Sequence, residues 1–234
     1  MKKVLAVLAV AAFATPALAE YATADVTGGG KITGHVTYKG AKPVLPDEKR
    51  DKNPDICGTK GANQTLLVGA GNGIANTIVY IKDIKAGKAM TPVTADIDQK
   101  GCSYAPHVQA VPAGSTLNIL NDDPLLHNIH ASQGGTTVFN YAMPLTVKKI
   151  PKKVSKPGFI TIKCDVHGWM NGAVGVMDNP YFAVTGEDGS YTIDDVPAGT
   201  YTVGAWQERL HDKTAPVTVA AGAPATVDFS YSGL

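Results

Sequence analysis

Residues 183 to 206 read AVTGEDGSYTIDDVPAGTYTVGAW, and apolar and polar side chains alternate there on both sides of two turns. The Asp-Gly pair at 188–189 fits a tight hairpin turn, and Pro-Ala-Gly at 197–199 fits the next turn. Glycine accepts positive φ in such turns, and proline presets φ. A period of two bounded by turns is typical of β-strands, so this stretch predicts strands joined by short turns.

Similar strand-like runs recur along the whole chain. Each run is short, rich in Val, Ile or Thr, and bounded by Gly, Pro, Asn or Asp. The runs are 31–39 (KITGHVTYK), 76–81 (NTIVYI), 115–120 (STLNIL), 159–163 (FITIK) and 200–205 (TYTVGA). No amphipathic stretch of about 12 or more residues argues for a helix. We therefore predict an all-β chain whose strands form sandwiches.

The N-terminal segment MKKVLAVLAVAAFATPALAE has the three parts of a secretory signal peptide. Lys2 and Lys3 precede an apolar segment at 4–14, and Ala-Leu-Ala at 17–19 is a small-residue cleavage site. The apolar segment is too short to span a bilayer. We therefore predict a signal peptide at 1–19 and an exported protein, periplasmic or secreted, without stable membrane insertion. An uncleaved N-terminal anchor is the alternative.

Composition narrows the classes of partner and activity. The 234 residues carry a formal net charge of +1, and removal of residues 1–19 with their two lysines lowers this charge to −1. A nearly neutral chain gives no reason to expect nucleic acid as a partner. The sequence has no nucleophile elbow, phosphate loop or paired-carboxylate motif, so we do not expect an enzyme.

The stretch KCDVHGWM, residues 163–170, places a thiol, an imidazole and a thioether at intervals of three: Cys164, His167 and Met170. A fourth donor, His127, follows a strand and an Asn-Asp-Asp-Pro turn. In a β-sandwich, a histidine at such a place can face a loop that leaves a later strand. Two histidines and one cysteine with a weak axial methionine form a blue-copper electron-transfer site. Zinc is the alternative, although zinc would prefer a second thiolate or a carboxylate to a methionine.

Between Cys102 and Val176 the sequence resembles the cupredoxins, the single-copper electron carriers of the periplasm. The segment GSTLNILNDDPLLHNIH at 114–130 is similar to their early strands, and C-x2-H-x2-M is similar to their short ligand loop of the amicyanin type. The resemblance implies an eight-stranded Greek-key sandwich over 92–178. It also implies one type-1 copper ion, held by His127, Cys164, His167 and Met170.

A second resemblance is carried by 183–206, where T-x-x-D-G-x-Y-x-I is followed by V-P-x-G-x-Y. This pattern is similar to the carboxypeptidase regulatory-like (transthyretin-like) sandwich, which normally begins with strands like those at 32–43 and 75–84. The resemblance implies a discontinuous regulatory-like sandwich made of 30–85 and 181–234, with the cupredoxin sandwich inserted in it or adjacent to it. Three modules in series are the alternative, but the first would be too short to hold a core.

The cysteines and the remaining histidines complete the set of candidate residues. Three cysteines in an export compartment suggest one disulfide and one remaining thiol. Cys57 and Cys102 could pair, and Cys164 would then be left for a metal. His107 is expected to pack in a strand, whereas His130 is a surface residue, an outer-shell group or an alternative ligand.

Five lysines crowd into the nine residues before the ligand strand: Lys148, Lys149, Lys152, Lys153 and Lys156. Because like charges so dense cannot pair with one another, we predict an exposed, extended loop here rather than a strand. This basic patch would steer an acidic redox partner, such as a c-type cytochrome or a dehydrogenase. A merely solvated connection is the alternative.

Two functional classes follow from these features. The first is an exported type-1 copper protein that carries one electron at a time to a redox partner protein. The second is a periplasmic copper-handling protein, or a non-redox binding scaffold whose copper loop is vestigial. Strong absorption near 600 nm with reversible redox, which the family resemblance implies, would distinguish the first class from the second.

Overall fold

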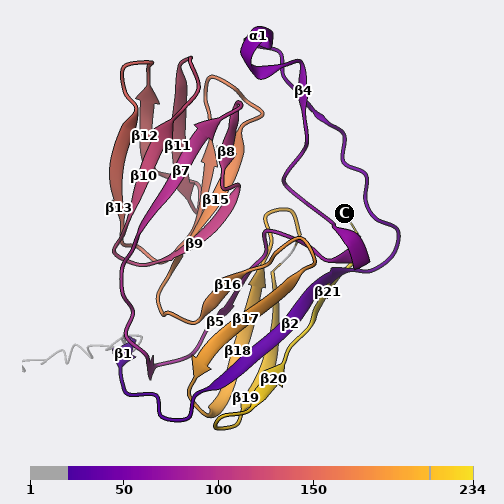
Figure 1. Cartoon of the computed structure of the whole chain (residues 1–234), viewed down its shortest axis with the longest axis vertical. Coiled ribbons are helices and arrows are strands. Elements are labelled where there is room, and N and C mark those ends of the chain that lie inside the picture. The colour runs from indigo at the N-terminus through magenta and orange to yellow at the C-terminus, as the bar shows by residue number, and fades with distance from the viewer. Residues whose placement is uncertain (1–20, 211, 234) are drawn as a thin grey trace, which may run out of the picture.

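The computed structural model describes residues 21–210 and 212–233, so the predicted signal peptide at 1–19 lies outside the described residues. Strands dominate this part of the chain, and its longest helix, α1 (Pro54–Cys57), has a single turn. No helix among these residues is long and apolar enough to cross a membrane. The chain is all-β, as the alternating runs predict, and its strands form two sandwiches, one above the other in Figure 1.

The lower sandwich combines two early strands with strands from the C-terminal part of the chain. Its sheets have the orders β16-β5-β18-β19 and β17-β2-β20, and β21 also pairs with β2. The early strands, β2 and β5, thus pair with strands of the 182–231 segment. The bounds are β2 (Gly30–Tyr38), β5 (Ile78–Ile81), β16 (Phe182–Val184), β17 (Ser190–Val196), β18 (Gly199–Trp206), β19 (Lys213–Val219), β20 (Pro224–Thr226) and β21 (Phe229–Tyr231).

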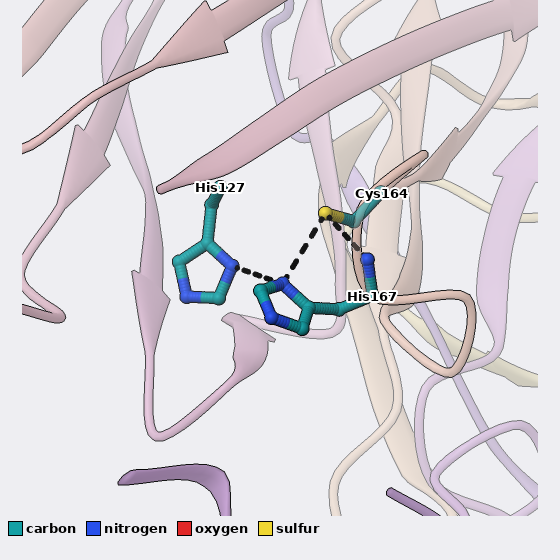
Figure 2. A group of neighbouring side chains, drawn as sticks. All are labelled: His127, Cys164 and His167. Atoms are coloured by element: carbon teal, nitrogen blue, oxygen red, sulfur yellow. Dashed lines mark hydrogen bonds between the residues drawn. The ribbon is translucent and has the colours of Figure 1, made fainter. Parts of the chain in front are cut away.

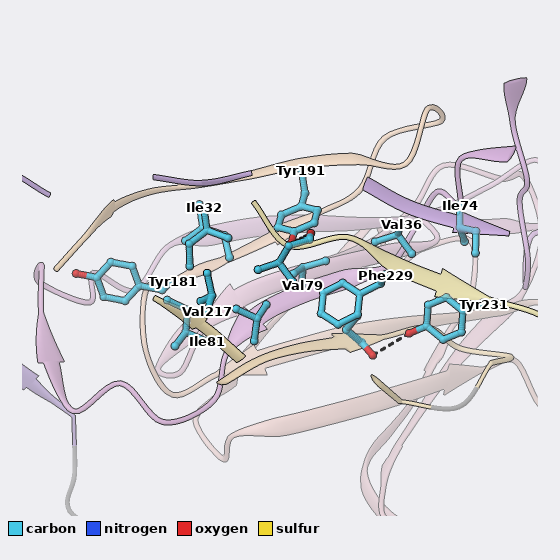
Figure 3. Close-up of a cluster of buried hydrophobic side chains, with 14 of the residues drawn as sticks. Ile32, Val36, Ile74, Val79, Ile81, Tyr181, Tyr191, Val217, Phe229 and Tyr231 are labelled. Atoms are coloured by element: carbon cyan, nitrogen blue, oxygen red, sulfur yellow. Dashed lines mark hydrogen bonds between the residues drawn. The ribbon is translucent and has the colours of Figure 1, made fainter. Parts of the chain in front are cut away.

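The core of the lower sandwich follows from the alternation in its strands. Along β2 buried and more exposed residues alternate, because successive side chains of a strand point to opposite faces. Ile32 and Val36 of β2 pack with Val79 of β5, Tyr191 of β17 and Phe229 of β21 (Figure 3). Full burial of an apolar side chain of this size stabilises the fold by about 1.5–3 kcal/mol.

The upper sandwich is formed by the continuous segment from β7 to β15. Its sheets have the orders β13-β10-β7-β8 and β12-β11-β14-β15-β9, and the chain crosses repeatedly between them in Greek-key fashion. The bounds are β7 (Thr94–Lys100), β8 (Ser103–Ala105), β9 (Val108–Pro112), β10 (Ser115–Asn121), β11 (His127–Gln133), β12 (Thr136–Met143), β13 (Lys149–Val154), β14 (Gly158–Lys163) and β15 (Asn171–Met177). These are nine strands rather than the eight implied by the family resemblance, because the three-residue β8 forms a short hairpin with β7.

The expectation of a loop at the clustered lysines is wrong. Residues 149–154 form β13, which pairs antiparallel with β10 at the edge of the four-stranded sheet. Pro151 is tolerated because an edge strand leaves one row of backbone groups unpaired, so a missing N–H there costs little. Lysines on an edge strand also discourage pairing with another chain, so their density is compatible with this strand.

The two sandwiches contact each other through a small apolar cluster. Ile78 of β5 packs with Val108, Ala173 and Met177 of the upper sandwich. Phe159 of β14 stacks on Trp206 of β18, with ring centroids 4.7 Å apart and planes 8° apart. The two cores are therefore separate, but the faces between them are joined by packed side chains.

A long excursion connects β2 to β5. Its first part carries β3 (Glu48–Lys49), α1 and β4 (Lys60–Gly61), and rises beside the upper sandwich in Figure 1. Its last part returns to the lower sandwich, where Leu66, Val68 and Ile74 join the core and a 3-10 turn at Ala70–Asn72 lies beside β2. A disulfide between Cys57 and Cys102 fastens the excursion to the β7–β8 hairpin. A further short pair, β1 (Ala22–Thr23) with β6 (Ala86–Gly87), lies where the chain passes between the sandwiches.

Candidate metal centre

The candidate ligands lie at one end of the upper sandwich because of how its strands pair. His127 opens β11, Cys164 directly follows β14, and these two strands are paired neighbours. The loop 164–170 then turns the chain into β15. Two backbone hydrogen bonds close this loop: Met170 N–H donates to the His167 carbonyl (2.9 Å), and Cys164 N–H donates to the Met170 carbonyl (3.2 Å).

Three donor atoms converge at this end of the sandwich (Figure 2). The Nδ1 atoms of His127 and His167 are 3.0 Å apart, and Cys164 Sγ lies 3.8 Å from His167 Nδ1. One ligand atom from each residue lies within 4.8 Å of the others. Both imidazoles are fully buried and Cys164 is 3% exposed, so the donors meet away from solvent.

The fourth predicted ligand, Met170, is buried in the same apolar core as Cys164. It ends the loop that begins at Cys164. The sulfur of Cys164 also accepts a hydrogen bond from the backbone N–H of His167 at 3.3 Å. This bond holds the sulfur at the start of the ligand loop.

The electrostatic surroundings keep both imidazoles in their neutral form. Burial lowers the pKa of His127, although the neighbouring carboxylate of Asp123 opposes this effect. Burial, and next the proximity of His127, lower the pKa of His167 to about 4. Because a neutral imidazole nitrogen is the form that ligates a metal, both rings suit a metal site at neutral pH.

The hydrogen bonds on the far side of each ring determine which nitrogen faces the site. His127 Nε2–H donates to Asp123 Oδ2 (2.8 Å), and His167 Nε2–H donates to Asn53 Oδ1 (2.9 Å). Each neutral ring therefore carries its proton on Nε2 and a lone pair on Nδ1. Two lone pairs 3.0 Å apart repel each other unless a cation lies between them, so this donor set fits a metal ion.

Asp123 connects His127 to the disulfide-bearing hairpin. Its carboxylate accepts hydrogen bonds from the backbone N–H groups of Gly101 and Cys102, both at 2.8 Å, in addition to the bond from His127. The residue is 6% exposed. Partners of this kind orient a metal-binding histidine and increase its basicity.

Asn128, the residue after His127, holds the two ligand-bearing segments together. Its side-chain oxygen accepts a hydrogen bond from the backbone N–H of Asp165, and its amide donates to Asp165 Oδ2 (3.1 Å) and to Asn140 Oδ1 (2.6 Å). The hydrogen bond from His130, and then that from Asn140, lower the pKa of the Asp165 carboxyl. This network fixes the chain directly after Cys164 to β11 and β12.

Two further histidines considered as candidates, His107 and His130, lie outside the donor cluster. His130 lies on the outer face of β11, where Nδ1 is 3.0 Å from Asp165 Oδ1 and Nε2 is 2.9 Å from Thr137 Oγ1. His107 is buried just before β9, and its Nε2 lies 2.7 Å from Glu208 Oε2. His130 therefore supports Asp165, whereas His107 forms a polar contact between the two sandwiches.

The three cysteines have separate roles. Cys57 and Cys102 are joined, and Cys164 is a buried free thiol. Cys102 also lies near Asp123 and His127, but its sulfur is used in the disulfide, so this second group of donors is not a metal site. The cluster of His127, Cys164 and His167 is the candidate site.

Sequence reasoning missed the two residues that orient the imidazoles. Asp123 stands four positions before His127, inside a stretch recognised only as a turn. Asn53 lies 114 positions before His167, in a segment with no strand pattern. A local search for acceptors before each histidine would have found Asp123, but no sequence signal marks Asn53.

The C-terminal part of the chain matches a known family. Residues 173–232 match the carboxypeptidase regulatory-like domain. The match runs from β15 through the strands that complete the lower sandwich. None of the curated proteins matches the chain.

Several solved structures are similar to part of the chain. A copper-containing nitrite reductase from Thermus scotoductus is 23% identical over 38% of this chain and 24% of its own, with a TM-score of 0.34. A purple cupredoxin from Nitrosopumilus maritimus is 25% identical over 36% of this chain and 99% of its own, at a TM-score of 0.32. A mutant of amicyanin in the Cu(I) state is 20% identical over 36% of this chain and 82% of its own, at a TM-score of 0.33. The chain thus spans about a quarter of the nitrite reductase.

Proposed function

We propose that this protein is an exported type-1 copper protein that carries single electrons. The observation that carries this proposal is the pair of buried imidazoles whose Nδ1 atoms face each other at 3.0 Å beside a free thiol. His127, Cys164 and His167 would hold the ion, with Met170 as the axial donor. A copper ion bound by such donors passes between Cu(I) and Cu(II), and the axial ligand tunes its potential.

An electron carrier needs a metal site whose geometry changes little between redox states. The residues around the donors would hold the ligands in place in this way. Asp123 and Asn53 hold the two rings by their Nε2 atoms. Asn128 fixes the segment after Cys164, and burial excludes water. Ligands held in this way need little rearrangement when the charge of the site changes, which favours rapid transfer.

We also propose a division of the chain into modules. Residues 92–178 would be the cupredoxin module, and 30–85 with 181–234 the regulatory-like module, preceded by the signal peptide at 1–19. Support comes from the pairing of β2 and β5 with strands of the 182–231 segment, and from the separate apolar cores of the two sandwiches. The cupredoxin module would then be inserted in the regulatory-like one.

The proposed partner is an acidic redox protein, such as a c-type cytochrome or a dehydrogenase. Four lysines on or beside β13 are exposed: Lys148, Lys149, Lys153 and Lys156. Lys152 instead lies over the ring of Phe139, with its Nζ 5.6 Å from the ring centroid. An edge with several exposed cations attracts a negatively charged surface from a distance.

Electrochemistry of the copper-loaded protein tests the proposed function. A carrier gives a reversible one-electron wave and exchanges electrons rapidly with a small redox protein. A copper-handling protein, the second class, would hold Cu(I) and lose the metal on oxidation. Irreversible oxidation with release of copper would therefore contradict the carrier function while leaving copper binding intact.

A further inference from the structure

Part of the excursion between β2 and β5 lies against the ligand loop of the other sandwich. We call residues 47–61, which include β3, α1 and β4, the cap. The Cys57–Cys102 disulfide fastens it to the upper sandwich. Lys52 Nζ donates to the carbonyl of Val166, inside the ligand loop, at 2.8 Å.

Arg50 adds a second fastening point. Its Nη1 donates to the carbonyls of Cys57 (2.8 Å) and Gly101 (3.0 Å), and its Nη2 lies 3.1 Å from Ser103 Oγ. The guanidinium thus binds both the cap and the β7–β8 hairpin, on either side of the disulfide. The cap is therefore held to the module that carries the donors by a disulfide and by hydrogen bonds.

One residue of the cap reaches the site itself. Asn53 accepts the Nε2–H of His167 through Oδ1 at 2.9 Å. Asn53 also has φ 50° and ψ 52° at the start of α1, a left-handed conformation that asparagine adopts more readily than most residues. Asparagine at this position therefore satisfies both the backbone and the imidazole.

The two imidazoles are oriented by different parts of the chain. His127 is held by Asp123, four residues away in the same sandwich. Among the described residues, Nδ1 of His167 has His127 and Cys164 as polar partners, and Nε2 has Asn53. Without Asn53, the Nε2–H of His167 would lose its acceptor, and the ring would lose the contact that fixes which nitrogen faces Cys164.

The cap and the ligand loop also meet at the disulfide. Trp169, two residues after His167, donates from its indole N–H to the carbonyl of Cys102 at 3.0 Å. The Trp169 ring packs against His167, with centroids 5.0 Å apart. Cys102 is thus held by the cap through its sulfur and by the ligand loop through its carbonyl.

We propose that Asn53 is the positioning residue of His167, and that the cap closes the Nε2 edge of this ring from solvent. This role rests on the proposed copper function. The cap lies between two strands of the regulatory-like module, but it would act at the metal site of the cupredoxin module. Electron exchange and copper entry at this edge would then depend on the cap.

The test is made first on the metal-free protein, by measuring how fast Cys164 reacts with Ellman's reagent. Asn53→Gly removes the acceptor but tolerates positive φ, so it separates the hydrogen bond from backbone strain. Asn53→Asp keeps an acceptor oxygen. Thr59→Ala, at an exposed position of the same cap, is the matched control.

We expect Asn53→Gly to raise the rate by about fivefold, the factor that corresponds to one lost hydrogen bond. Asn53→Asp and Thr59→Ala should keep the slow wild-type rate. Equal rates for wild type and Asn53→Gly would overturn the proposal. So would an equal increase in Thr59→Ala, because that result would mean that any change in the cap loosens it.

The second readout is the absorption spectrum after copper loading. The band of Asn53→Gly should shift or broaden because His167 is no longer held, and Asn53→Asp should restore its shape. An unchanged band in Asn53→Gly would overturn the positioning role. A wild-type protein that gains no colour would instead contradict the proposed function, and the thiol measurement on the metal-free protein separates that outcome from failure of the cap.

Discussion

Removal of the Asp123 carboxylate should both destabilise the protein and weaken metal binding. Asp123 accepts three hydrogen bonds of 2.8 Å, from His127 Nε2 and from the backbone N–H groups of Gly101 and Cys102. In Asp123→Ala these three donors lose their acceptor; His127 and Cys102 are buried, whereas Gly101 is exposed. Each loss at a buried donor costs about 1–3 kcal/mol, so the free energy of unfolding should fall by about 2 kcal/mol or more.

Metal affinity should fall as well, since His127 would no longer be held with Nδ1 toward the site. Loss of a residue that orients a ligand typically weakens metal binding by about 10–100-fold. Asp123→Asn should have a smaller effect. Its oxygen can turn toward His127 and Cys102, so that only the bond from Gly101 is lost, at a cost of about 1 kcal/mol.

The assay is urea unfolding of the metal-free protein, followed by its tryptophan fluorescence, with copper affinity measured by competition with a chelator. The matched control is Asp122→Ala. Asp122 is the preceding residue, and its exposed ion pair with Lys100 (3.6 Å) should contribute about 0–1 kcal/mol. Wild-type stability and affinity in Asp123→Ala would refute the reasoning, as would an equal loss in Asp122→Ala.

Three further predictions concern the axial ligand, the disulfide and the lysines. Met170→Leu should keep a coloured site and raise its reduction potential, because loss of the axial donor favours Cu(I); loss of all copper binding would contradict an axial role. Peptide mapping without reduction should find Cys57 joined to Cys102, and replacing both by serine should cost about 2–4 kcal/mol in urea unfolding; a disulfide involving Cys164 would contradict the site. Replacing Lys149, Lys153 and Lys156 by glutamate should slow electron transfer to an acidic partner several-fold at low salt and hardly at high salt, because salt screens such charges beyond about 8 Å; equal slowing at both salt concentrations would contradict steering.

The fold could be predicted largely from local patterns. The run FITIK became β14, and STLNIL lies within β10, because alternation and turn residues reflect burial on one face of a strand. β13 was missed because its charges dominate the pattern and only Val154 is buried. An edge strand needs few apolar residues, so its sequence resembles that of a loop.

The donor residues could also be selected from local spacing, and the structure brings His127, Cys164 and His167 to within 4.8 Å of one another. Their surroundings could not be selected in this way. Asn53 lies in an excursion without a strand pattern and reaches His167 only through the tertiary fold. A single tertiary contact leaves no repeating pattern in the sequence, because it constrains the residue type at one position only.

The measurement that tests the central claim most directly is an absorption spectrum taken after one equivalent of Cu(II) is added to the metal-free protein, alongside Cys164→Ser. If His127, Cys164 and His167 hold a type-1 copper ion, the wild type should develop a strong visible band from the thiolate–copper bond. Cys164→Ser should fold normally, as judged by its circular dichroism, and show no such band. A colourless wild type, or a band of equal strength in Cys164→Ser, would contradict the claim.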